Sequence, residues 1–168
     1  MKKTVLILWA AIILFCFTGC KKTAENPPQL SSVSFTAQVT SGKNEYTVNT
    51  VLSEDGTVKG TVTAPETLKG AVFTAKDDEV TLEFHGIAYT KKIDDYPVTS
   101  VITSLCGIIN DAKNGNLEGS GADNRRISGK CKGLEYEFWF TPSGLPLKLS
   151  VPETDTVIVF SDTAITEK

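Results

Sequence analysis

The stretch VSFTAQVTSGKNEYTVNTVLSEDGTVKGTV, residues 33–62, decides the fold of this chain. Apolar and polar residues alternate through it, which is the period of a strand with one buried face and one face in solvent. Gly42-Lys43-Asn44 and Asp55-Gly56 interrupt the alternation. Asp-Gly pairs favour tight hairpin turns, because a type I′ turn needs positive φ at both central positions. The stretch therefore predicts three antiparallel strands joined by two short turns.

The alternation resumes in most of the chain that follows, and turn residues separate the alternating segments. Asp77-Asp78, Lys132-Gly133 and Ser143-Gly144 supply three of these turns. About eleven strands are expected in meander order. Beyond the first three, they are Ala71–Lys76, Glu79–His85, Ile87–Lys92, Asn116–Gly121, Arg125–Cys131, Leu134–Thr141, Pro146–Val151 and Thr156–Phe160.

One segment, Pro97–Lys113, has its apolar residues at helical spacing, with Thr, Ser and Asp opposite them. Pro97 suits a first helical turn, and Asn114-Gly115 ends the pattern. A sheet of this many strands must curl, and the helix has an apolar face to bury. We therefore expect a mainly β fold: a strongly curved antiparallel sheet, or open half-barrel, with one amphipathic helix across its concave face.

The first twenty residues have the features of a lipoprotein signal peptide. Lys2 and Lys3 precede Val5–Phe17, an uncharged apolar run of 13 residues that is short for a membrane-spanning helix. The run ends in Phe-Thr-Gly-Cys, the pattern of a lipobox. We expect residues 1–19 to be removed and Cys20 to receive a diacylglycerol anchor; an uncleaved membrane anchor is the alternative. Either interpretation places the remaining chain outside the cytoplasm, held at the outer face of the cell membrane.

The predicted mature chain is mildly acidic. Residues 1–19 contain two lysines and no acidic residue, so their removal changes the net charge from −3 to −5. This charge argues against nucleic acid as a partner. We expect a lipidated tether at 20–31, because KKTAENPPQL has a Pro-Pro pair and no apolar periodicity. One half-barrel domain follows at 32–162, with a flexible tail at 163–168.

Two cysteines remain once Cys16 is removed and Cys20 is acylated. Extracytoplasmic compartments are often oxidising, so Cys106 and Cys131 are predicted to form a disulfide. Two buried thiols are the alternative.

Residue sets that could carry catalysis or bind a metal are scarce. His85 is the sole histidine and stands beside Gly86, with no motif marking a serine nucleophile. Asp77-Asp78 and Asp94-Asp95 fit turns. Asp111–Asp123 offers oxygen ligands whose spacing does not match a calcium loop. We predict no catalytic residue, no metal site and no cofactor.

Apolar and aromatic residues of the strands and the helix are expected to face one another across the concavity. They either fill the concavity as a solid core or leave a pocket for an acyl chain or another hydrophobic ligand. The same residue types are expected in both cases. The residues that would line such a cavity are Phe84, Val101, Leu105, Ile109, Tyr136, Phe138, Phe140, Leu147 and Leu149.

The order of elements resembles the LolA/LolB-like lipoprotein-carrier fold. The motif TAPETLKG at residues 63–70 and the Tyr96-Pro97 helix entry also carry the resemblance, which covers about residues 32–162. The carriers begin with a further helix, whereas Cys20–Leu30 is polar and Pro-rich. The resemblance implies a non-catalytic, lipid-anchored protein that binds or carries a lipid or other hydrophobic ligand. A ligand-free sensor or interaction domain that regulates a membrane-bound partner is the alternative.

The lipid anchor gives a first testable prediction. Cys20→Ala should abolish acylation and leave an unprocessed precursor, because no other residue can supply the thioether sulfur. Mass spectrometry of the N-terminus checks this. An unmodified Cys20 in the wild-type protein, or a chain that starts at another residue, would contradict it.

Overall fold

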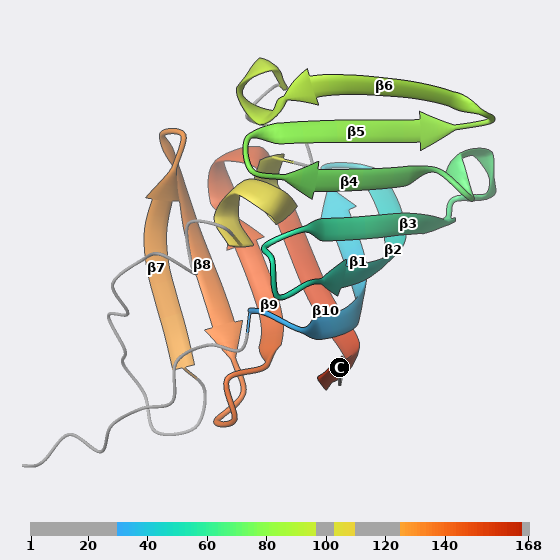
Figure 1. Ribbon diagram of the computed structural model, residues 1–168. Coiled ribbons are helices and arrows are strands. Elements are labelled where there is room, and N and C mark those ends of the chain that lie inside the picture. Colours follow the sequence, from blue (N-terminus) through green and yellow to red (C-terminus); the bar gives the residue numbers. More distant parts are fainter. Residues whose placement is uncertain (1–29, 97–102, 110–124, 166–168) are drawn as a thin grey trace, which may run out of the picture.

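The computed structural model describes residues 30–96, 103–109 and 125–165. These residues form one open antiparallel sheet of ten strands, in the order β6-β5-β4-β3-β2-β1-β10-β9-β8-β7 (Figure 1). The strands are β1 (Val33–Ser41), β2 (Asn44–Leu52), β3 (Val58–Ala64), β4 (Val72–Lys76), β5 (Glu79–Phe84), β6 (Ile87–Lys92), β7 (Arg125–Cys131), β8 (Leu134–Phe140), β9 (Pro146–Val151) and β10 (Thr156–Ile165). Short helical turns η1 (Glu66–Leu68), η2 (Ile93–Asp95), η3 (Thr103–Gly107) and η4 (Pro152–Thr154) lie between strands.

The sheet consists of two arms that meet where β1 pairs with β10. One arm is the meander β1 to β6, and the other is the meander β7 to β10. The sheet is strongly curved, so β3 to β6 run across the direction of β7 to β10 in Figure 1. The predicted mainly β, curved and open antiparallel sheet is confirmed.

Alternate residues of the strands are buried on one face of the sheet, as the sequence pattern predicted. On β1 the buried residues are Val33, Phe35, Ala37 and Val39. Aromatic rings link β1, β10 and β8 across this face: the ring centroids of Phe35 and Phe160 are 4.9 Å apart, and those of Phe160 and Phe138 are 5.6 Å apart. Trp139, whose neighbours on both sides are buried, lies half-buried on the opposite face, where the ammonium of Lys148 is 5.1 Å from its ring. The concave face is therefore apolar and packed.

The helical segment packs on the same core, although only its central part is described. Residues 103–107 form a turn of π-helix, and Ile108 and Ile109 continue it as α-helix. Leu105, Cys106, Ile108 and Ile109 are all buried in the cluster that contains the inner residues of the strands. The remainder of the predicted helix Pro97–Lys113 lies outside the described residues, so the amphipathic helix as a whole stays a prediction. Within the described ranges, no helix is long and apolar enough to cross a bilayer.

At the ends of the described domain, β10 runs past the predicted strand end at Phe160, and the core begins before the first predicted strand. Strand β10 continues to Ile165, into the segment expected as a tail, because Ala164 and Ile165 pair with Ser34 and Val33 of β1. Leu30, expected in the tether, is buried in the core. The predicted strand Asn116–Gly121 lies outside the described residues, which contain ten of the eleven expected strands.

One glycine in each arm lies beneath an aromatic ring of the neighbouring strand. Gly60 on β3 pairs with Phe73 on β4, and Gly129 on β7 pairs with Tyr136 on β8. A Cβ atom at either glycine would overlap the paired ring. Glycine in a strand interior often marks such a close approach. Each ring therefore covers the bare backbone of its partner strand.

We expect Gly60→Ala and Gly129→Ala each to lower the free energy of unfolding by about 1–3 kcal/mol, because the added methyl overpacks the site. Urea denaturation of each variant checks this. The double variant Gly60→Ala/Phe73→Ala should have the same free energy of unfolding as Phe73→Ala alone, because the ring that the methyl would overlap is gone. Equal stability of Gly60→Ala and the parent chain would contradict the packing described here.

Candidate ligand-binding site

The structure places most of the predicted cavity residues in a packed core. Six of the nine are buried, at 0–2% exposed: Leu105, Ile109, Tyr136, Phe138, Phe140 and Leu149. Phe84 is half-buried at the end of β5, where its ring lies 4.0 Å from that of His85, and Leu147 is half-buried on β9. Val101 lies outside the described residues. The structure brings the six together, and their role as cavity lining stays a prediction.

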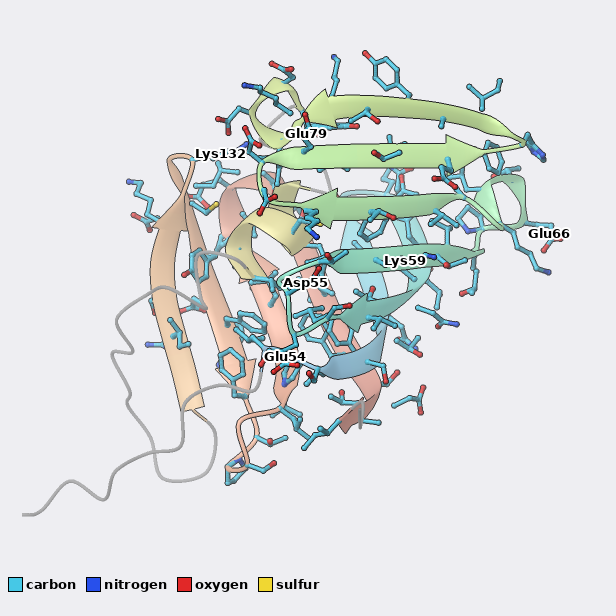
Figure 2. The ribbon with its side chains drawn as sticks, viewed as in Figure 1. Glu54, Asp55, Lys59, Glu66, Glu79 and Lys132 are labelled. Atoms are coloured by element: carbon cyan, nitrogen blue, oxygen red, sulfur yellow. The ribbon has the colours of Figure 1, made fainter. Side chains whose placement is uncertain are left out.

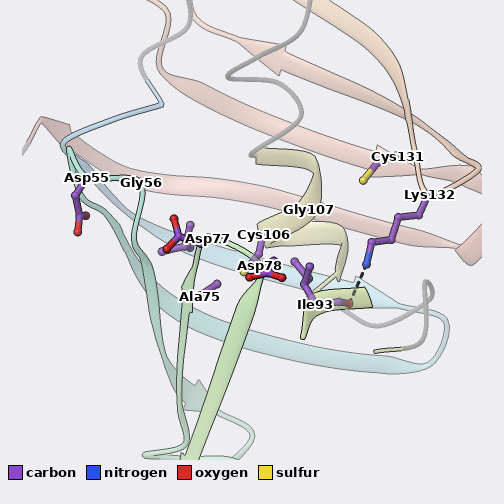
Figure 3. Close-up of a pocket in the computed structure, with 11 residues that line it drawn as sticks. Asp55, Gly56, Ala75, Asp77, Asp78, Ile93, Cys106, Gly107, Cys131 and Lys132 are labelled. Atoms are coloured by element: carbon purple, nitrogen blue, oxygen red, sulfur yellow. Dashed lines mark hydrogen bonds between the residues drawn. The ribbon is translucent and has the colours of Figure 1, made fainter. Parts of the chain in front are cut away.

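A pocket of about 690 Å³ lies elsewhere, between the two arms of the sheet (Figure 3). One arm contributes the β2–β3 turn with Asp55 and Gly56, and the β4–β5 turn with Asp77 and Asp78. The other arm contributes Cys131 and Lys132 at the β7–β8 turn, and Cys106 and Gly107 come from the helical turn. Val58, Ala75 and Ile93 complete the lining. Apolar side chains thus line a space whose rim carries charge.

Asp55 is fixed at this rim by its own turn. The backbone N–H and the hydroxyl of Thr57 each donate a hydrogen bond of 3.0 Å to its carboxylate, and Lys76 Nζ lies 3.0 Å from Oδ2. The backbone hydrogen bond from Thr57 is the largest cause that lowers the pKa of Asp55 to about 2, followed by Lys76. This carboxylate is therefore ionised throughout the physiological pH range.

Lys132 joins the tips of the two arms across the pocket. Its ammonium donates a hydrogen bond of 2.8 Å to the carbonyl oxygen of Ile93, drawn in Figure 3. The same ammonium lies 2.8 Å from Oδ1 of Asp94. Both partners belong to η2, which follows the edge strand β6, whereas Lys132 follows the edge strand β7. Its proximity lowers the pKa of Asp94. The contact therefore connects the two ends of an otherwise open sheet.

The two cysteines of the predicted disulfide both line the pocket, and their pairing stays a prediction. Cys106 lies on the helical turn with its thiol buried, whereas Cys131 is half-buried at the end of β7 (Figure 3). Burial raises the pKa of the Cys106 thiol to about 12. That thiol is protonated and weakly nucleophilic at neutral pH.

The pocket presents few kinds of chemical group to a ligand. Among the residues that the structure describes, no group of three or more His, Cys, Asp and Glu is placed to hold a metal ion. His85 is exposed at the β5–β6 turn, at the end of β5 remote from Asp78. The pocket offers apolar side chains and carboxylates, which can hold a molecule with an apolar part and a polar end.

Sequence reasoning missed the rim residues as a group. From the sequence, Asp77-Asp78 and Lys132-Gly133 are predicted as turns, and nothing marks them as parts of one site. Figure 2 labels Asp55 at the β2–β3 turn of one arm and Lys132 at the β7–β8 turn of the other. Their positions in turns at strand ends were a usable signal, but the sequence does not say which turns the curvature of the sheet brings together.

The sequence matches no protein-family model and no curated protein. In structure it is similar to an uncharacterised conserved protein from Thermus thermophilus, with a TM-score of 0.54 and 13% identity over 81% of this chain and 79% of that chain. A LolA superfamily protein from Nitrosomonas europaea gives a TM-score of 0.45 and 9% identity, over 81% of this chain and 86% of that one. The Mycobacterium tuberculosis lipoprotein LppX gives a TM-score of 0.43 and 14% identity, over 82% of this chain and 87% of that chain. At these identities each likeness is one of fold alone.

The buried thiol gives a testable prediction. In the mature chain carrying Cys20→Ala, only Cys106 and Cys131 remain. We expect Cys106 to react with a thiol reagent at pH 8 at least about a hundredfold more slowly in the folded chain than in the denatured chain, because its raised pKa leaves almost no thiolate. Reaction kinetics with and without Cys106→Ser identify the slow thiol. Fewer than two reactive thiols after denaturation without reductant would show instead that the pair is oxidised.

Proposed function

We propose that this chain is a non-catalytic, lipid-anchored extracytoplasmic protein that binds or carries a lipid or other hydrophobic ligand. The observation that carries the proposal is the pocket between the two arms. Its lining includes the apolar side chains of Val58, Ala75 and Ile93, together with Cys106. Its volume of about 690 Å³ is in the range of small-molecule sites in proteins.

The pocket is continuous with the apolar interior of the sheet. Val58 and Ala75 pair with each other on β3 and β4, and both also belong to the buried core. Cys106 is part of the same core through the helical turn. An apolar ligand in the pocket would therefore remove from water a surface that adjoins the core, which is favourable in proportion to the apolar area covered.

The place where the chain enters the sheet also favours this function. Val33, the first residue of β1, pairs with Leu52, and the β2–β3 turn that follows Leu52 lines the pocket. A tether from Cys20 to the buried Leu30 would reach on the order of 20 Å by coil statistics. An acylated Cys20 would thus hold the pocket end of the domain close to the membrane, where apolar ligands are found.

A ligand-free sensor or interaction domain is the second candidate. The packed core favours it, because Leu105, Phe138 and Leu149 fill the concavity that a larger cavity would need. Such a domain would keep the same anchor and act through a protein partner on the membrane.

Binding of the uncharged dye Nile red to the mature chain with Cys20→Ala distinguishes the two candidates. We expect saturable binding of one dye per chain, with a blue shift of its emission. Ala75→Phe should weaken this binding at least about tenfold. The added ring would occupy part of the pocket, and the loss of even a small apolar contact with the ligand lowers affinity by roughly this factor.

Thr74→Phe is the matched control, since Thr74 lies next in sequence on β4 and alternation places it on the opposite face. It should leave dye binding unchanged. No saturable binding by the parent chain would favour the sensor, and equal binding by Ala75→Phe and the parent would exclude this pocket as the site.

A further inference from the structure

We infer that the pocket selects its ligand by the charge of the polar end: amphiphiles with a cationic head bind, and those with an anionic head are excluded. This inference rests on the proposed function and adds the class of ligand. It follows from the charges on the lining and from how each is already engaged.

The charged residues of the lining are predominantly acidic. Asp55, Asp77 and Asp78 contribute three carboxylates, and Lys132 contributes the one ammonium in the lining of this pocket. All three aspartates stand in turns at the ends of strands of the same arm. A ligand head at the rim therefore meets carboxylates on the side formed by the β2–β3 and β4–β5 turns.

The ammonium of Lys132 is already engaged by partners within the chain. Its contacts of 2.8 Å, to the Ile93 carbonyl oxygen and to the Asp94 carboxylate, use two of its three N–H donors, and Asp94 balances its charge. Its side chain is 22% exposed, against 80% for Asp94. An anionic head at Lys132 would therefore compete with the Asp94 carboxylate for the same charge.

Two of the carboxylates are only partly compensated. Asp78 lies 3.8 Å from Lys92, and both side chains are well exposed. Asp77 has no ion pair within 4.0 Å among the described residues, whereas Asp55 is paired with Lys76 at 3.0 Å. Figure 3 shows Asp77 and Asp78 side by side on the rim. The β4–β5 turn is therefore where negative charge remains for a cationic head.

The apolar lining and the rim have separate roles in this arrangement. Val58, Ala75 and Ile93 favour an alkyl chain irrespective of its head. The exposed carboxylates change affinity only modestly, by roughly fivefold each for a unit charge about 4 Å away in water. A preference of roughly tenfold or more between cationic and anionic heads is expected, and added salt should reduce it.

The test compares three amphiphiles with the same ten-carbon chain, below their micellar concentrations, as competitors of Nile red on the mature Cys20→Ala chain. Decyltrimethylammonium and decanesulfonate carry fixed opposite charges, and decyl maltoside is uncharged. We expect decyltrimethylammonium to displace the dye at least about tenfold more effectively than decanesulfonate at low ionic strength, with decyl maltoside between them, and the difference to shrink at high ionic strength.

Two charge-neutralising variants locate the effect. Asp77→Asn/Asp78→Asn removes two carboxylates from the rim and should reduce the preference to within about twofold. Glu66→Gln/Glu83→Gln removes the same number of charges towards the other end of the same arm, where Figure 2 labels Glu66, and should keep the preference.

The outcomes separate the two proposals. Equal displacement by the two charged amphiphiles, a preference for decanesulfonate, or loss of the preference in the control variant would overturn the charge selection while leaving the binding function intact. If neither Nile red nor decyl maltoside binds, the proposed function itself is wrong.

Discussion

Strand β10 pairs with β1 in antiparallel order, from Ser41 opposite Thr156 to Val33 opposite Ile165. This pair joins the beginning and the end of the domain at the centre of the sheet, so β6 and β7 become the two edges. Of the segment between these two edge strands, Leu105, Ile108 and Ile109 are buried in the core. The described helical turn therefore packs on the inner face of the sheet whose order the pairing of β1 with β10 sets.

The two arms of the sheet curve away from the central β1–β10 pair. Twist between neighbouring strands accumulates across a wide sheet, and in each arm one aromatic ring lies over a glycine of the neighbouring strand. The pairs Gly60–Phe73 and Gly129–Tyr136 let the rings pack close to the backbone, one pair in each arm. The arms turn so far that the β7–β8 turn reaches η2, and Lys132 bonds the Ile93 carbonyl. The pocket is the space that remains beneath this contact.

The strands and the inner face were predictable because period-two alternation is a local signal. Strands β6, β7 and β9 have the predicted bounds, and Tyr136, Phe138 and Phe140 are buried as expected. The pocket was not predictable, because Asp55, Asp78 and Lys132 meet only through the summed curvature of ten strands. Solid core and cavity could not be separated either, since both require the same apolar residues and differ only in packing. The extension of β10 to Ile165 was missed because Ser161, Asp162 and Thr163 break the apolar pattern, whereas pairing with β1 continues regardless.

The acidic rim also bears on how an apolar pocket can exist in a water-exposed domain. A contiguous exposed apolar surface promotes association between copies of a protein, and charged turns around such a surface oppose it. Asp55 is ionised at any physiological pH, since Thr57 and Lys76 hold its pKa at about 2. The negative charge of Asp55 at the β2–β3 turn is therefore permanent, whereas the apolar residues of the lining lie below it. The charged turns at the strand ends thus oppose association of copies through the apolar lining while the pocket stays open to water. The same charges are the first groups that an entering ligand head would meet.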